Sequence, residues 1–100
     1  MPLEVVLHPK FDPDYLALPF PVQDEADRVI AALRRRPFAP GVGYSVEQLG
    51  GDFDPGVRVA HFLENQFRLL FWVYGNHLIL VAVGRRPGFY RSLDRLRGRP

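Results

Sequence analysis

The chain contains no cysteine, so it forms neither disulfides nor thiolate metal sites. This absence leaves the cellular compartment open. Long hydrophobic runs are also missing, because the longest one, Leu78 to Val83, is far shorter than the roughly 20 residues that cross a bilayer. The first residues lack the basic, apolar and small-residue pattern of a secretory signal. A cytoplasmic protein with no membrane partner is therefore the default expectation.

Lysine is almost absent as well, since Lys10 is the only one among 13 basic residues. Hydrophobic residues make up 47% of the 100 positions, which suffices for one modest core, so we expect a single domain over residues 1–100. The net charge of +2 hides an asymmetry: residues 1–54 carry five basic and nine acidic side chains, whereas residues 55–100 carry eight and two. A basic C-terminal half is typical of a polyanion-binding face, although a solvated arginine-rich tail gives the same count.

The first third of the chain predicts one strand followed by two helices. Leu3 to Leu7 is apolar and β-branched, as in a strand. Asp12 to Leu18 predicts a short helix, with Asp12 as the N-cap and a proline at the first helical position. A second helix starts at Val22, where apolar residues begin to recur every three or four positions, and Pro37 ends it.

The rest of the chain predicts antiparallel strands joined by tight turns. The glycine-rich stretch 38–56 predicts a loop. Three strands and a short terminal helix follow it: Val57 to Leu63, Phe67 to Tyr74, His77 to Gly84 and, for the helix, Arg91 to Arg97. We therefore predict an α+β fold of order β-α-α-β-β-β(-α), with the two N-terminal helices packed on one face of a largely antiparallel sheet.

The last two predicted strands form an apolar hairpin with arginine at its exit. The second of them is apolar at nearly every position, as expected for a strand covered on both faces. In the first, alternation places Arg68 on the face opposite to Phe67 and Phe71. Arg85, Arg86 and a tyrosine follow the hairpin, and guanidinium groups match phosphate oxygens in geometry and charge. The pattern indicates a phosphate-binding site, with RNA as the first partner to test.

Several segments carry a more specific signal through their order and spacing. They are the N-terminal strand with Phe11-Asp12-Pro13-Asp14-Tyr15-Leu16-Ala17-Leu18-Pro19 after it, the helix ending in Leu33 with Pro37 beyond it, Leu49-Gly50-Gly51, Phe67-Arg68-Leu69-Leu70-Phe71, and Val83-Gly84-Arg85-Arg86 followed by Tyr90. Over almost its whole length the chain resembles the RelE/ParE superfamily of toxins from toxin–antitoxin systems. The resemblance implies a RelE-like fold, no cofactor, and a ribosome-associated endoribonuclease that cleaves mRNA and is held inactive by an antitoxin protein.

The resemblance also implies which side chains face the scissile phosphate. In that superfamily they are an arginine of the third strand of the sheet, basic and tyrosine residues after the fourth, and, loosely matched here, a basic residue of the second strand. We expect catalytic roles for Arg68, Arg86, Tyr90 and His61, and RNA contacts for Arg58, Arg85 and Arg91. Many relatives have histidine where Arg85 stands. Because the ParE branch shares the architecture yet targets DNA gyrase, a non-catalytic protein of the same fold is the alternative.

RNA cleavage by the 2′-hydroxyl needs a base, an acid and cations that stabilise the transition state. Arg68 and Arg86 would supply positive charge, and Tyr90 would transfer a proton or stack on an unpaired base. We predict no metal site, because His8 and His77 are far apart in the chain and no HxxH-type pattern exists.

Each of these side chains also has an ordinary structural explanation. Arg68 could form a surface ion pair, Tyr90 could pack the C-terminal segment on the sheet, and His61 could be a half-buried strand residue without a catalytic role. At a surface position, replacement of Arg68 would change stability little.

Overall fold

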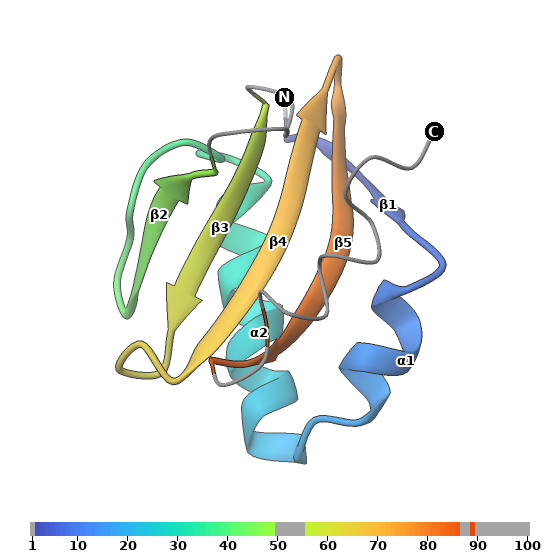
Figure 1. Ribbon diagram of the computed structural model, residues 1–100. Helices are drawn as coiled ribbons and strands as arrows, with labels where there is room; N and C mark the ends of the chain where they lie inside the picture. Colours follow the sequence, from blue (N-terminus) through green and yellow to red (C-terminus); the bar gives the residue numbers. More distant parts are fainter. Residues whose placement is uncertain (1, 50–55, 87–88, 90–100) are drawn as a thin grey trace.

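A five-stranded sheet packed against two helices forms the body of the molecule (Figure 1). The computed structural model describes residues 2–49, 56–86 and 89. The strands are β1 (Glu4–Leu7), β2 (Tyr44–Gln48), β3 (Val57–Phe62), β4 (Phe67–Tyr74) and β5 (His77–Arg85), and the helices are α1 (Phe11–Leu16) and α2 (Phe20–Leu33). In space the strands follow the order β1-β5-β4-β3-β2, with β1 parallel to β5 and every other pair antiparallel. The predicted α+β class is confirmed.

Strand β2 lies inside the stretch that the sequence predicts to be a loop, so that prediction is wrong at residues 44–48. Tyr44 and Val46 are half-buried, whereas Ser45 and Glu47 between them are exposed. This alternation is short, and the surrounding glycines and prolines mask it. The strand forms because it pairs with β3, a long-range contact that local sequence does not reveal. The predicted terminal helix, Arg91 to Arg97, lies outside the described residues.

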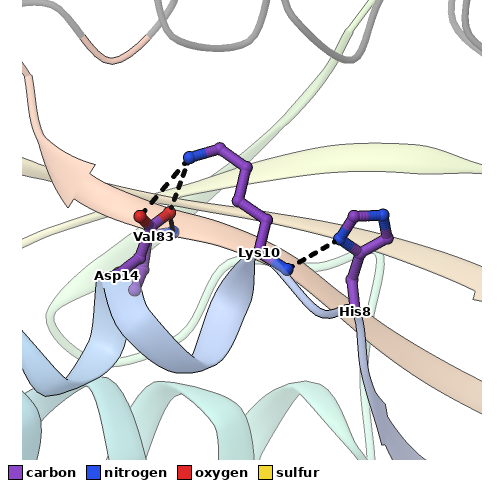
Figure 2. A network of polar contacts seen from close by, with 4 residues as sticks. All are labelled: His8, Lys10, Asp14 and Val83. Atoms are coloured by element: carbon purple, nitrogen blue, oxygen red, sulfur yellow. Dashed lines mark hydrogen bonds and ion pairs between the residues drawn. The ribbon is translucent and has the colours of Figure 1, made fainter.

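Helix α1 begins at Phe11, with Lys10 rather than the predicted Asp12 at the N-cap, and no side chain caps it. Phe11 is buried in the core, and this burial outweighs the capping preference of aspartate. Asp14 ties the helix to the sheet, because its Oδ2 accepts a hydrogen bond from the Val83 N–H of β5 and pairs with Lys10 Nζ, each at 3.3 Å (Figure 2). The carboxylate thus occupies the edge of β5 beyond the end of β1.

Helix α2 begins at Phe20, two positions before the predicted Val22, and ends at Leu33, before Pro37. Pro21 lies in its first turn, where a missing N–H breaks no helical hydrogen bond. The Pro-Phe-Pro segment therefore starts the second helix as well as separating it from the first.

A tyrosine of α1 joins the two helices. Tyr15 Oη donates a 2.7 Å hydrogen bond to Asp27 Oδ1, and this bond, together with burial and the nearby negative charge, raises the pKa of Tyr15 to about 12. Gln23 of α2 donates from Nε2 to the carbonyl oxygens of Tyr15, in the last turn of α1, and Leu18, just after that helix. These bonds fix the angle between the helices.

The two faces of the sheet carry separate apolar clusters. The buried residues of the helix-side cluster are Phe11, Leu18, Ala26, Val29, Leu33, Ala60, Phe62, Phe67, Leu69, Phe71, Leu78, Leu80 and Val83. The buried residues of the other are Val57, Val59, Leu70, Ala82 and Phe89. Figure 1 views the second face, with α2 behind the sheet.

A β-bulge explains why β5 is apolar at nearly every position. Leu70 of β4 pairs with Ala82, but the next residue, Phe71, pairs with Leu80, so Val81 is an extra residue in β5. Val81 and Ala82 consequently both pack into the cluster on the face away from the helices. The prediction that this strand is covered on both faces is confirmed.

Candidate functional site

A row of side chains crosses the sheet on the face away from the helices. Ser45 of β2 lies opposite His61 of β3, His61 lies opposite Arg68 of β4, and Arg68 lies opposite Gly84 of β5. Directly opposed residues of neighbouring strands point to the same side of a sheet. An open groove of about 650 Å³ runs along this row and is lined by Ser45, Val46, Glu47, His61, Asn65 and Arg68. The sheet thus brings together His61 and Arg68, two of the predicted site residues.

Asn65, in the turn between β3 and β4, links the other two side chains. Arg68 Nη1 donates to Asn65 Oδ1 at 2.7 Å, and His61 Nδ1 lies 3.1 Å from the same oxygen. An arginine nitrogen can only donate, so this contact identifies the amide oxygen as the acceptor. His61 must then present a proton on Nδ1, which leaves Nε2 as the nitrogen that exchanges protons.

Glu47 lies next to that reactive nitrogen. Its Oε1 is 3.4 Å from His61 Nε2, and the histidine side chain is 12% exposed while the glutamate side chain is 59% exposed. In neutral His61 the Nε2 lone pair is available as a base. Once Nε2 takes up a proton, the imidazolium can donate to Asn65 and Glu47 at the same time. Asn65 therefore holds His61 through Nδ1, as histidine is held through one ring nitrogen in known acid–base catalysts, while Glu47 lies beside the other nitrogen.

The turn that presents Asn65 is conformationally unusual. Leu63, Glu64 and Asn65 have φ angles of 52°, 54° and 69°, and none of them is glycine. The left-handed region costs an L-residue about 1–2 kcal/mol, less for asparagine. Strain of this kind is found at functional sites, where it positions a side chain that the site requires.

Arg68 is buried, with 5% of its surface exposed. The alternative of a surface arginine in an exposed ion pair is therefore wrong, and the small stability cost expected for a surface position no longer applies. Burial of a guanidinium group requires compensating hydrogen bonds, and Asn65 accepts two from Nη1, at Oδ1 and at its backbone oxygen (3.4 Å). Arg68 thus has a structural role in the turn in addition to lining the groove.

Arg86 follows β5 at the same end of the sheet. Its N–H donates to the Gln66 carbonyl at 2.8 Å, which holds the chain against the β3–β4 turn, and its side chain is exposed. Phe89 donates from its N–H to the Arg86 carbonyl at 3.3 Å and is buried on the groove-bearing face. A Cβ placed on Gly84 would lie 3.7 Å from the Phe89 ring, so the ring packs over this glycine.

Two of the predicted RNA-binding arginines are not brought to the groove. Arg58 lies on the helix side of β3, with its guanidinium carbon 4.8 Å from the centre of the Phe38 ring. Arg85 lies over the Phe67 ring at 5.2 Å, also on the helix side. Their cation–π contacts stabilise that face instead. Tyr90 and Arg91 lie outside the described residues.

Three polar residues of the groove were not expected from the sequence, namely Ser45, Glu47 and Asn65, and neither was the apolar Val46. Ser45 and Glu47 belong to β2, where the alternation of apolar and polar residues was the sequence signal for a strand. Nothing in the local sequence marks Asn65 apart from its position in a predicted turn. A second hollow, of about 460 Å³, lies between α2 and residues 40–44 and contains none of the predicted site residues.

The described residues were also compared with the requirements of metal and membrane sites. Within residues 2–49, 56–86 and 89, no cluster of three or more histidine, aspartate or glutamate side chains could hold a metal ion. No helix in these ranges has the length and apolar character needed to cross a membrane.

Comparison with known proteins identifies the fold. No protein-family model and no curated protein matches the sequence. A chain of the RelBE2 toxin–antitoxin complex from Mycobacterium tuberculosis matches with a TM-score of 0.68 and 20% identity, over 86% of this chain and 100% of that one. The YoeB dimer from Staphylococcus aureus matches with a TM-score of 0.67 and 18% identity, over 82% of this chain and 94% of that one. A copper-bound mutant toxin from Helicobacter pylori matches with a TM-score of 0.66 and 18% identity, over 87% of this chain and 98% of that one. The chain therefore has a RelE-like toxin fold, as the resemblance implied.

Proposed function

We propose that this protein is the toxin of a toxin–antitoxin pair and that it cleaves mRNA on the ribosome. The fold supports the first part, because similar structures are toxins, one of them in a complex with its antitoxin. The observation that supports cleavage is the hydrogen-bonded set His61, Asn65 and Arg68 in an open polar groove. It combines a proton acceptor of fixed tautomer with a buried positive charge.

In the proposed reaction the RNA itself supplies the nucleophile. His61 Nε2 takes the proton of a 2′-hydroxyl, the 2′-oxygen forms a bond to phosphorus, and the bond from phosphorus to the 5′-oxygen breaks. The products are a 2′,3′-cyclic phosphate and a 5′-hydroxyl, so no external oxidant or cofactor takes part. Asn65 holds His61 in the required tautomer, and Glu47 accepts a hydrogen bond from the imidazolium that forms.

Arginine charge would stabilise the dianionic transition state in this scheme. Arg68 lies along the groove and is shielded from water, a setting in which charge acts strongly on a nearby phosphate. Arg86 is exposed at the same end of the sheet and would contact the RNA backbone. Tyr90 as the acid for the 5′-oxygen and Arg91 as a further RNA contact complete the proposal. We assign no role at the groove to Arg58 and Arg85.

The proposed antitoxin would be an acidic protein segment that orders on binding. Residues 55–100 carry eight basic and two acidic side chains, and a segment with this charge balance attracts an acidic chain. Exposed aromatic residues, Phe20 (81%), Phe38 (54%) and Tyr74 (63%), offer apolar contacts to the same partner.

Expression of the chain alone in a bacterial host should arrest growth and stop protein synthesis, because cleaved mRNA cannot be translated. The measurement is incorporation of labelled amino acid after induction, with mapping of mRNA ends in the same cells. Intact mRNA with continued protein synthesis would contradict the proposal that the protein is a nuclease. Growth arrest accompanied by DNA breaks would instead support the gyrase-directed alternative.

Exchange of Asn65 for glycine separates side-chain positioning from backbone strain. Glycine adopts positive φ without steric cost, and this relief offsets part of the stability that is lost with the Oδ1 hydrogen bond to buried Arg68. Asn65→Gly should therefore stay folded but be less stable than the wild type by about 1–2 kcal/mol. The cleavage rate should nevertheless fall about tenfold or more, because His61 loses the partner that fixes its tautomer. Glu64→Gly is the matched control, since Glu64 has a similar φ and no contact with the groove. Equal rates for both variants would show that Asn65 acts only through the backbone.

A further inference from the structure

Strand β1 presents an exposed apolar edge that none of the described contacts uses. Val5, Val6 and Leu7 are 38%, 40% and 49% exposed, unusually high values for three consecutive strand residues. β1 is the end strand of the sheet, and within residues 2–49, 56–86 and 89 it pairs with β5 alone, in parallel (Figure 1). Edges of this kind pair readily with another strand.

The outward-facing backbone groups of this edge belong to Val5 and Leu7. The N–H groups of Glu4 and His8 donate to the turn before β5 and to β5 itself. The backbone N–H and C=O groups of the even-numbered residues of β1 therefore point toward β5. The odd-numbered residues face away, and among the described residues no hydrogen bond uses the N–H or C=O groups of Val5 and Leu7.

Both ends of the free edge are closed. At one end, the Leu3 N–H donates to the Arg34 carbonyl at 2.8 Å, and Arg34 Nε donates to the Leu3 carbonyl at 2.9 Å. At the other end Pro9 has no N–H to donate. The available window is therefore Val5 to Leu7, and it is symmetric about Val6.

We propose that two copies of this chain pair through β1, antiparallel and about a twofold axis at Val6. In this register Val5 of each copy lies opposite the partner's Leu7, and the outward groups of these residues form four N–H···O bonds across the axis. The two Val6 side chains meet at the centre. This inference rests on β1 alone and is independent of the proposed function.

Charge complementarity supports a second copy as the occupant rather than an arbitrary peptide. The same register places Glu4 opposite the partner's His8, twice in the dimer, on the face that carries Val6. His8 Nδ1 already accepts a hydrogen bond from the Lys10 N–H at 3.1 Å (Figure 2). Neutral His8 therefore carries its proton on Nε2 and can donate it to the opposing carboxylate. The strand is thus complementary to itself in hydrogen bonding, shape and charge.

Disulfide trapping tests the register directly, because the chain has no cysteine of its own. In Val6→Cys the two cysteines would form a non-hydrogen-bonded pair with Cα atoms about 4.5 Å apart, within the range of a disulfide. In the matched control, Val5→Cys, the symmetry-related Cα atoms would lie about 8–9 Å apart, beyond that range. We expect mild oxidation to cross-link the Val6→Cys protein at least about tenfold faster than the control. Equal rates for the two variants would overturn the proposed pairing.

A second comparison tests the backbone bonds without cysteine. Val5→Pro removes one outward N–H and leaves the ladder to β5 intact, whereas Val5→Thr keeps the N–H and the branched shape. Sedimentation velocity over a range of concentrations should show dimer for the wild type and Val5→Thr, and monomer for Val5→Pro. Circular dichroism should show that all three are folded. A wild-type protein that remains monomeric at every concentration, or a dimer that Val5→Pro leaves unchanged, would contradict the proposal.

Discussion

His61→Gln should lower the single-turnover rate of RNA cleavage by about a hundredfold to ten-thousandfold, the usual range for loss of a positioned acid–base group. Glutamine can still hydrogen-bond to Asn65 or Glu47, but it cannot exchange a proton at neutral pH. The melting temperature should change little by comparison, since the polar contacts of the side chain are partly retained. The cleavage rate and the melting temperature are both measured, for the wild type and for the variant.

Glu47→Gln is the control for this experiment. It keeps a hydrogen-bond acceptor near His61 Nε2 and removes only a negative charge that is 59% exposed. Its effect on the rate should stay within about tenfold, because exposed ion pairs contribute little. A folded His61→Gln protein with an undiminished rate would mean that the base is another residue and that the groove is wrongly assigned.

Arg68→Ala should have two large effects at once. Cleavage should slow by about a hundredfold or more, as expected when a preorganised charge is lost from a transition-state site. Stability should fall by about 1–3 kcal/mol, because Asn65 loses its donor and a buried cavity replaces the guanidinium group. Chemical denaturation and single-turnover kinetics on the same preparation measure both.

Arg68→Lys separates the two roles. Lysine keeps a positive charge and can reach an acceptor, but it lacks the planar fork that contacts Asn65 and a phosphate together. We expect most of the stability to return while the rate stays at least about tenfold below the wild type. A lysine variant with the wild-type rate would show that any positive charge suffices. An alanine variant that loses stability and keeps its rate would show that Arg68 is purely structural.

The hairpin of β4 and β5 was predictable because its signals are local. Apolar runs on either side of Gly75 fix the strands, and alternation places Arg68 and Phe71 on opposite faces, as the structure has them. The order of strand, helix, helix and antiparallel strands followed from such runs except at β2, and the RelE-like fold was expected from the family resemblance. His61 and Arg68 were named as site residues from the family resemblance, and pairing of β3 with β4 in the observed register brings them together.

The remaining features depend on contacts between distant parts of the chain. β2 forms because β3 is available to pair with it, so Glu47 could not be placed beside His61 from the sequence. Asn65 reaches His61 and Arg68 because three consecutive residues adopt left-handed φ angles, and no turn motif in the sequence predicts that conformation. Arg58 is an exception, because strand alternation is a local signal and places it on the face opposite to His61, toward Phe38; it was assigned to the site only by loose correspondence with the family.

In the proposed reaction the groove between β2 and β4 cleaves RNA by attack of the 2′-hydroxyl. The most direct measurement is end-group analysis of an mRNA incubated with ribosomes and purified protein in a buffer that contains the Mg²⁺ needed to keep the ribosomes assembled. We predict fragments that end in a 2′,3′-cyclic phosphate or its 3′-phosphate product and begin with a 5′-hydroxyl, formed by the wild type and absent with His61→Gln. Intact RNA with the folded wild-type protein, or equal cleavage by both proteins, would contradict the account.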